Sequence, residues 1–223
     1  MAARSAPTEA IQDYAKAIYG LERRLPGAVM TSALAERLEI SPASVTAMLK
    51  RMSEAGLVEH EPYHGVRLTA AGEKVALEVI RHHRLLESYL ADALGMPWDR
   101  VHAEAEVLEH YISEELEERI ATALGDPPVD PHGDPIPNRE LEISTEDGTA
   151  LAEMEPGDSG TFSRVSDSNS EMLRYLAERG IRPGTTLLVT ERQPFGGPLF
   201  IEVGGERHAI GGELAERMLI SCR

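Results

Sequence analysis

Imidazole and carboxylate side chains crowd the segment HAEAEVLEH, residues 102–110. In a helix, positions three and four residues apart share a face, so we expect Glu106, Glu109 and His110 to converge, with His102 one turn before Glu106. Nitrogen and oxygen donors without a thiolate suit divalent ions such as manganese or ferrous iron. The segment therefore predicts a metal site, and a solvated acidic helix face is the alternative for the same residues.

A second pair of candidate ligands, His83 and Glu87, stands four residues apart in the preceding helical segment. One such pair is more often a surface hydrogen bond than a pair of ligands, but two sets on neighbouring helices can build a metal site. A metal-dependent hydrolase or a metal-storage protein is a further alternative. Because the sequence contains no GxSxG or P-loop pattern, we do not expect an enzyme.

The elements that must position these side chains begin with predicted helices at residues 8–24, 31–39 and 42–55. Two helices joined at a tight turn and followed by a hairpin are typical of a winged helix-turn-helix, with an inert helical hairpin as the alternative. Small and hydroxyl side chains at the start of the third helix would let the backbone approach base edges, while basic residues meet phosphates. The predicted DNA-contacting set is Thr31, Ser32, Ser41, Pro42, Ala43, Ser44, Thr46, Ala47, Lys50, Arg51 and Arg67.

The remainder of the chain predicts helices at 70–95 and 98–124, and then a proline-rich segment, 126–140, that is a linker or an ordered extended loop. From residue 141 onward, short apolar runs alternate with glycines, which is typical of a small β-rich domain. The expected fold class is α+β.

The formal net charge of −16 is spread unevenly along the chain. It is zero over residues 1–75, −10 over 76–140 and −6 over 141–223. The neutral first third favours nucleic-acid binding, which an evenly acidic chain would oppose. No apolar run is long enough to span a membrane, no secretory signal is recognisable, and the single cysteine, Cys222, excludes an intrachain disulfide. We expect a cytoplasmic protein that does not contact membranes.

An ordered series of segments resembles the diphtheria-toxin-repressor family of metal-dependent transcription factors. Its members along the chain are QDYAKAIYGLE (12–22), ALAERLEISPASVTAMLKRMSEAGLV (33–58), VRLTAAGEKVA (66–76), IRHHRLLESYL (80–90), GMPWDRVHAEAEVLEH (95–110), PHGDPIP (131–137), RYLAERGIRPGTTLLV (174–189) and PFGGPLFIEVGGERHAIGGELAERMLI (194–220). The resemblance implies a winged helix-turn-helix at 1–75, a helical dimerisation and metal-binding domain at 76–140, and an SH3-like β-barrel at 141–223. That barrel is the domain the family shares with ferrous-iron-transport accessory proteins.

The resemblance also implies two metal positions in each subunit of a homodimer. The regulatory position would take Asp13 from the first helix together with Glu106, Glu109 and His110. The second would take His83, Glu87 and His102, with a further ligand from the SH3-like domain. Glu171 is preferred for that ligand over Asp167 and Asn169.

Two positions favour manganese over iron. The iron-responsive branch of the family carries a methionine where Asp13 stands and a cysteine where Glu106 stands, and oxygen donors suit Mn²⁺ better than sulfur does. Lys16 departs from the pattern, because short manganese regulators carry a further glutamate there. The resemblance thus predicts a Mn²⁺-dependent repressor of a palindromic operator, with Fe²⁺ as the alternative activator and Co²⁺ or Zn²⁺ as substitutes in vitro.

Overall fold

The computed structural model describes residues 7–24, 27–61, 64–144, 148–166 and 169–221. The chain forms two compact units, and each is described by itself. Unit 1 comprises residues 1–82, 109–111 and 137–142, and unit 2 comprises 83–108, 112–136 and 143–223.

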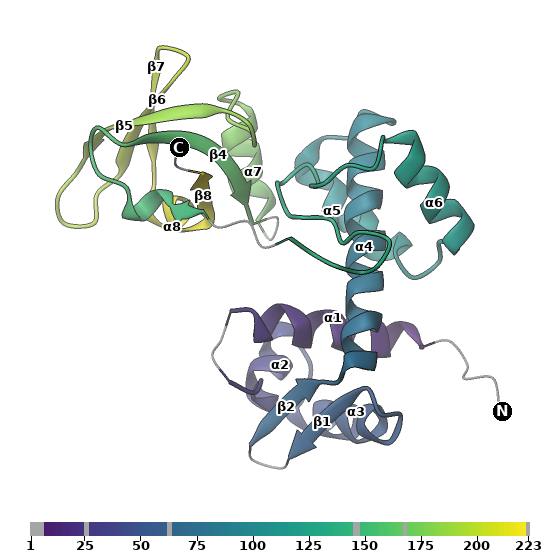
Figure 1. Ribbon diagram of the computed structural model, residues 1–223. Helices are drawn as coiled ribbons and strands as arrows, with labels where there is room; N and C mark the ends of the chain where they lie inside the picture. The colour runs from purple at the N-terminus through teal and green to yellow at the C-terminus, as the bar shows by residue number, and fades with distance from the viewer. Residues whose placement is uncertain (1–6, 25–26, 62–63, 145–147, 167–168, 222–223) are drawn as a thin grey trace. The chain divides into compact units, whose positions relative to one another are not determined.

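Unit 1 contains the predicted winged helix-turn-helix (Figure 1). Helices α1 (Glu9–Glu22), α2 (Thr31–Arg37) and α3 (Pro42–Glu54) precede the antiparallel strands β1 (Val58–Glu61) and β2 (Gly65–Leu68). The hydroxyl of Ser41 accepts a hydrogen bond from the Ser44 backbone N–H, and Pro42 follows in the first turn, so α3 starts where the sequence predicts. α3 contacts both α2 and β1.

Burial in unit 1 decides which side chains remain available for function. α3 buries Val45, Leu49 and Met52, a helical spacing that leaves its opposite face exposed. α1 buries Tyr14 and Ile18 in the same way. The side chain of Asp13, also on α1, is 45% exposed and therefore lies outside this core.

The helices of unit 2 are the second part of α4 (Ala70–Asp92), α5 (Trp98–Leu108) and α6 (Glu114–Ala123). They pack around a small core of Leu85, Leu86, Ala105, Ile120, Ala121 and Ile136. The single helix predicted at 98–124 is wrong, because the helix ends at Leu108 and a new one begins at Glu114. Ser113 starts α6 by accepting a hydrogen bond from the Leu116 N–H, and three glutamates occupy the first turn of α6.

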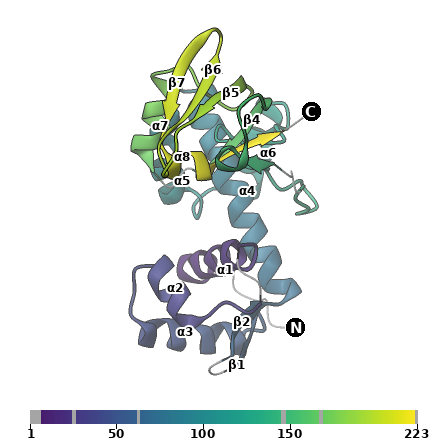
Figure 2. The ribbon, with the colours of Figure 1, turned by 90° about the vertical axis from the view of Figure 1, so that its left-hand side faces the viewer.

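The C-terminal part of unit 2 is a six-stranded antiparallel sheet in the order β3-β8-β4-β5-β6-β7. Figure 2 labels four of its strands, β4 to β7. The strands are β3 (Thr149–Ala150), β4 (Ser159–Val165), β5 (Thr186–Arg192), β6 (Leu199–Val203), β7 (Glu206–Ile210) and β8 (Met218–Ser221). The 3₁₀ turn η1 (Leu151–Glu153) and helices α7 (Ser170–Ala177) and α8 (Gly212–Arg217) complete it.

The predicted closed barrel is corrected to an open sheet within the described residues. β3 pairs only with β8, and β7 pairs only with β6. β3 and β7 are therefore the two edge strands of the sheet and do not pair with each other. β3 has two residues, too few for the long pairing that closes a barrel. The apolar core under this sheet includes Phe162, Leu176 and Ile201, and it also buries Trp98 of α5.

The proline-rich segment is an ordered loop. His132 is fully buried in it, and Asp130 is nearly so. Gly133 has φ +89°, and a Cβ there would lie 1.9 Å from the Ser163 carbonyl oxygen of β4, so the loop approaches β4 closely. Across the described ranges, we find no helix with the length and apolarity that a membrane crossing requires.

Candidate metal centres and nucleic-acid interface

Three predicted ligands meet in unit 1: Asp13, Glu109 and His110, called here the Asp13 group. The His110 Nε2 lies 3.0 Å from an Asp13 carboxylate oxygen and 3.6 Å from a Glu109 oxygen. His110 Nδ1 lies 2.8 Å from Gln12 Oε1, and because that oxygen only accepts, Nδ1 carries the proton. This contact leaves Nε2 facing the two carboxylates, an arrangement that fits a divalent cation.

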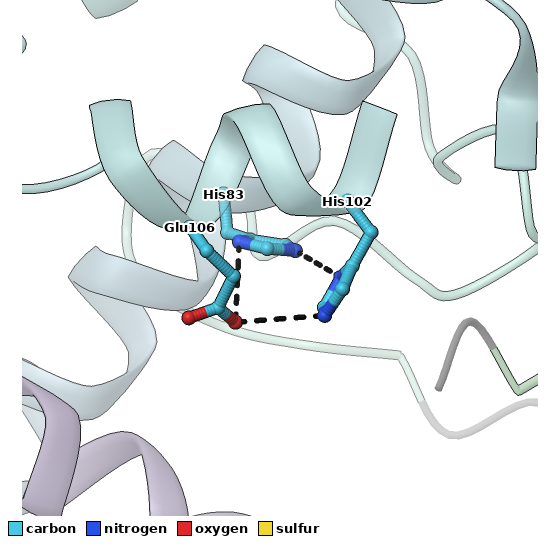
Figure 3. Close-up of side chains that lie close together, drawn as sticks. All are labelled: His83, His102 and Glu106. Atoms are coloured by element: carbon cyan, nitrogen blue, oxygen red, sulfur yellow. Dashed lines mark hydrogen bonds and ion pairs between the residues drawn. The ribbon is translucent and has the colours of Figure 1, made fainter. Parts of the chain in front are cut away.

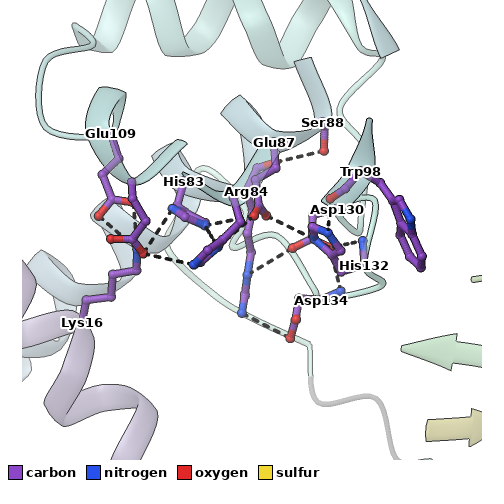
Figure 4. Close-up of polar contacts among 12 residues, drawn as sticks. Lys16, His83, Arg84, Glu87, Ser88, Trp98, Glu109, Asp130, His132 and Asp134 are labelled. Atoms are coloured by element: carbon purple, nitrogen blue, oxygen red, sulfur yellow. Dashed lines mark hydrogen bonds and ion pairs between the residues drawn. The ribbon is translucent and has the colours of Figure 1, made fainter. Parts of the chain in front are cut away.

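Glu109 is the most confined member of the Asp13 group. Its side chain is fully buried, and its backbone carbonyl lies 3.1 Å from His82 Nδ1. The Lys16 ammonium donates to both carboxylate oxygens, at 3.0 and 2.8 Å (Figure 4). A buried carboxylate is expensive without a cation, and Lys16 provides one.

His83, His102 and Glu106 form the second group, in unit 2 (Figure 3). His83 Nε2 and His102 Nδ1 are 3.0 Å apart, and the rings meet edge to face. One Glu106 oxygen lies 4.0 Å from His83 Nδ1 and 3.7 Å from His102 Nε2. Two imidazoles and a carboxylate within this distance are again a nitrogen and oxygen donor set for a divalent ion.

Glu87 extends this group with both of its oxygens (Figure 4). Oε1 lies 3.1 Å from His83 Nε2 and 3.2 Å from His102 Nδ1, and Oε2 lies 3.7 Å from His132 Nδ1. Burial alone would raise the pKa of Glu87, but His102, His132 and His83 outweigh it and hold that pKa well below its usual range. Glu87 is therefore ionised and available as an oxygen ligand.

The loop at residues 130–135 supports Glu87 from the other side. His132 Nε2 lies 2.9 Å from the Trp98 carbonyl oxygen and donates to it, so Nδ1 points at Glu87. Burial lowers the pKa of His132, but the Glu87 carboxylate more than compensates, and the net pKa is about 9. Asp130 accepts from the backbone N–H groups of His132 and Asp134, which shapes the loop, and it pairs with Arg84 at 3.7 Å.

The grouping differs from the sequence prediction at Glu106. The prediction joins Glu106 to Asp13, Glu109 and His110, but the structure places its carboxylate with His83 and His102. The physical reason is the helix end at Leu108. Glu109 and His110 lie in the turn that follows, where the three- and four-residue spacing of a helix no longer applies.

The predicted ligand from the C-terminal domain is not brought to either group. Glu171 is exposed at the start of α7 and belongs to none of the donor clusters among the described residues. The Asn169 side-chain oxygen caps α7 by accepting from the Glu171 and Met172 N–H groups. Asp167 lies outside the described residues.

Sequence reasoning missed Gln12, Arg84, Asp130 and His132. A signal existed for the last two, because DPHGDP joins turn-forming residues to a histidine in a segment predicted as a linker or an ordered extended loop. Periodicity could not find them, since a loop has no helical or strand spacing.

The predicted DNA-contacting residues all belong to unit 1. All are exposed except Thr31, which is half-buried. The Thr46 hydroxyl donates to the Pro42 carbonyl at 2.9 Å, and the hydroxyls of Ser41 and Ser44 are 2.8 Å apart. The exposed start of α3 thus presents small groups, and Lys50 and Arg51 follow on the same helix. This surface suits insertion into a major groove.

Three protein-family models match the chain in order. They are the iron dependent repressor N-terminal DNA binding domain at residues 7–66, the iron dependent repressor metal binding and dimerisation domain at 69–138, and the FeoA domain at 149–222.

Individual relatives match over most of the chain. The iron-dependent repressor IdeR of Mycobacterium tuberculosis is 31% identical over 220 residues, covering 93% of this chain and 94% of that protein. The diphtheria toxin repressor of Corynebacterium diphtheriae is 35% identical, covering 73% and 68%. A solved structure described as a manganese-dependent transcriptional repressor in complex with manganese is 38% identical, with a TM-score of 0.88, and covers 96% of this chain and 100% of that one.

These matches, together with the DNA-binding architecture of unit 1 and the two donor groups, show that the chain belongs to the iron-dependent (diphtheria toxin) repressor family, whose members are metal-dependent transcriptional repressors and not enzymes.

Proposed function

We propose that the protein is a manganese(II)-dependent repressor that binds a palindromic operator as a homodimer. The observation that carries this proposal is the donor set of the Asp13 group, which offers carboxylate oxygens and an imidazole nitrogen. Such donors suit Mn²⁺, whereas thiolates and thioethers favour softer metals.

The Asp13 group can link metal binding to DNA binding. Asp13 lies on α1, whereas Glu109 and His110 lie in the turn after α5, so ligands of one ion would fasten α1 to that turn. A bound divalent cation supplies the charge that offsets repulsion between the two carboxylates. In the homodimer, a fixed α1 would set the distance between the two α3 helices, which must match successive major grooves. Metal and DNA would then raise each other's affinity.

The second group would hold a further ion through His83, Glu87 and His102. We add Glu106 to this centre because its carboxylate lies 3.7 Å from His102. Glu171 of the C-terminal sheet domain stays the proposed additional ligand.

The proposed DNA surface is the exposed start of α3 with the wing residue Arg67. Val107, Leu108 and Leu116 are exposed apolar side chains of α5 and α6, and they would form part of the subunit interface. A repressor of this kind acts where the chromosome is, so we place the protein in the cytoplasm.

An iron(II)-dependent repressor is the alternative, and the 31% identity to the protein named iron-dependent repressor IdeR favours it. The carboxylate of Asp13 argues for manganese instead. Binding strength alone would not decide, because zinc and cobalt bind nitrogen and oxygen sites more tightly than manganese.

The test is metal-dependent DNA binding. A palindromic duplex is selected from a random pool with Mn²⁺ present, and its affinity is measured by fluorescence anisotropy with chelator, Mn²⁺ and anaerobic Fe²⁺. The metal carried by the protein in metal-replete cells is measured in parallel. We expect DNA affinity to rise with Mn²⁺ and Mn²⁺ to be the metal recovered. Equal affinity with chelator and with each metal would refute the mechanism, and recovery of iron alone would favour the alternative.

A further inference from the structure

Lys16 contacts the one member of the Asp13 group that has no access to solvent. Its ammonium donates to both Glu109 oxygens, at 3.0 and 2.8 Å, across a sequence separation of 93 residues. Glu109 is fully buried, whereas the Lys16 side chain keeps 22% of its surface exposed. The lysine therefore neutralises a carboxylate that water cannot reach.

The oxygens that Lys16 holds are the same atoms that Glu109 can offer to a metal ion. The donor atoms of Asp13, Glu109 and His110 all lie within 4.8 Å of one another. A divalent cation bound to a Glu109 oxygen would share that carboxylate with the Lys16 ammonium, and two cations on one carboxylate repel each other. Metal binding by Glu109 therefore competes with the two Lys16 hydrogen bonds.

We propose that Lys16 is a built-in competitor for the metal ion of the Asp13 group. In the metal-free protein its ammonium holds Glu109, and binding of a divalent ion displaces it. The displaced side chain has a route out, because part of its surface already meets solvent. This inference rests on the proposed function, since it requires that the Asp13 group bind a divalent ion.

A competitor of this kind sets the metal concentration at which the centre fills, without choosing between metals. Every divalent ion must displace the same Lys16 contact. The free-energy cost of that displacement therefore lowers the affinities for Mn²⁺ and Zn²⁺ by one common factor. A ligand that shapes the coordination geometry would instead change the two affinities by different factors. Lys16 is therefore a determinant of the response threshold and not of metal selectivity.

The experiment compares the full-length protein with Lys16→Met and Lys16→Gln, which remove the charge, and with Lys16→Arg, which keeps it. Mn²⁺ and Zn²⁺ dissociation constants are measured by competition with a fluorescent chelator, and thermal unfolding is followed with and without saturating metal. A hydrogen-bonded charge pair predicts Kd values tighter by on the order of ten- to a hundredfold in the first two variants. Lys16→Arg keeps a cation that can donate to both Glu109 oxygens, so it should not tighten metal binding.

Thermal unfolding supplies a readout that does not depend on metal loading. Without metal, Lys16→Met should have a lower melting temperature than the wild type, because Glu109 loses its cation. With saturating metal, the two proteins should have the same melting temperature. Unchanged metal affinity in Lys16→Met and Lys16→Gln, or unequal factors for Mn²⁺ and Zn²⁺, overturns the inference. An Asp13→Asn control separates the two proposals: if it binds metal like the wild type, the proposed centre itself fails.

Discussion

Replacing Gly133 with alanine tests how tightly the 130–135 loop is built into unit 2. The added Cβ would lie 1.9 Å from the Ser163 carbonyl oxygen and 2.9 Å from the Arg164 Cα. Both are backbone atoms of β4, which cannot rotate away as the end of a side chain would. Val165 N–H also donates to the His132 carbonyl at 3.0 Å, so loop and strand must shift together.

Two effects add up to the loss of stability expected for Gly133→Ala. A positive φ costs a residue with a Cβ about 1–2 kcal/mol, and overpacking adds about 1–3 kcal/mol. Gly133→Ala should therefore destabilise unit 2 by about 2–5 kcal/mol. Gly157 is a matched control, because its φ is +102° but its Cβ position has no neighbour within 4 Å. Gly157→Ala should be destabilised only by the cost of the positive φ, about 1–2 kcal/mol.

The single tryptophan provides the assay. Trp98 is 2% exposed and stacks on His132, with ring centroids 5.6 Å apart, so its fluorescence reports on this loop. Guanidinium unfolding of both variants is followed by this signal. If Gly133→Ala is no less stable than Gly157→Ala, the close approach of the loop to β4 is not a constraint and the reasoning is refuted.

Three further predictions address the donor groups, the helix start and the DNA surface. Glu106→Gln should weaken Mn²⁺ binding at the second group, which contains His83 and His102. Binding is measured in an Asp13→Asn background, and an unchanged Mn²⁺ isotherm there would favour the predicted place of Glu106 in the regulatory site. Ser113→Ala should lower the free energy of unfolding by about 1 kcal/mol through loss of the α6 cap; a change near zero in denaturant midpoint would show that the cap is dispensable. Lys50→Ala should weaken all duplexes alike and lower the slope of log affinity against log salt by about 1, whereas loss confined to one sequence would assign Lys50 to base recognition.

Local chemistry made much of unit 1 predictable. Ser41 and Pro42 mark the start of α3, and the apolar spacing of Val45, Leu49 and Met52 fixes its buried face. These signals act within a few residues of one another, so the sequence contains them completely. The strands of the C-terminal sheet were also expected, but its openness was not, because closure depends on pairing between strands that are distant in sequence.

The sequence predicts the individual ligands better than it predicts which of them belong to the same site. The family resemblance groups Asp13 with Glu109 and His110, and the structure brings these three together. Helical spacing also predicts Glu106 beside Glu109 and His110, but that spacing crosses a point where the helix ends. Ser113 followed by two glutamates was a readable sign of a new helix start. His132 could not be assigned to Glu87, because their contact is tertiary and crosses a segment without periodicity.

The interruption between Leu108 and Glu114 also resets helical phase. In one continuous helix, inserting a residue would rotate everything beyond it by about 100°. Here α6 takes its orientation from its own Ser113 cap and from the burial of Ile120 and Ala121, rather than from the helical phase of α5. A residue inserted between His110 and Ser113 would therefore leave His102 and Glu106 of α5 facing α4, because α6 has its own N-terminal cap and its own buried side chains.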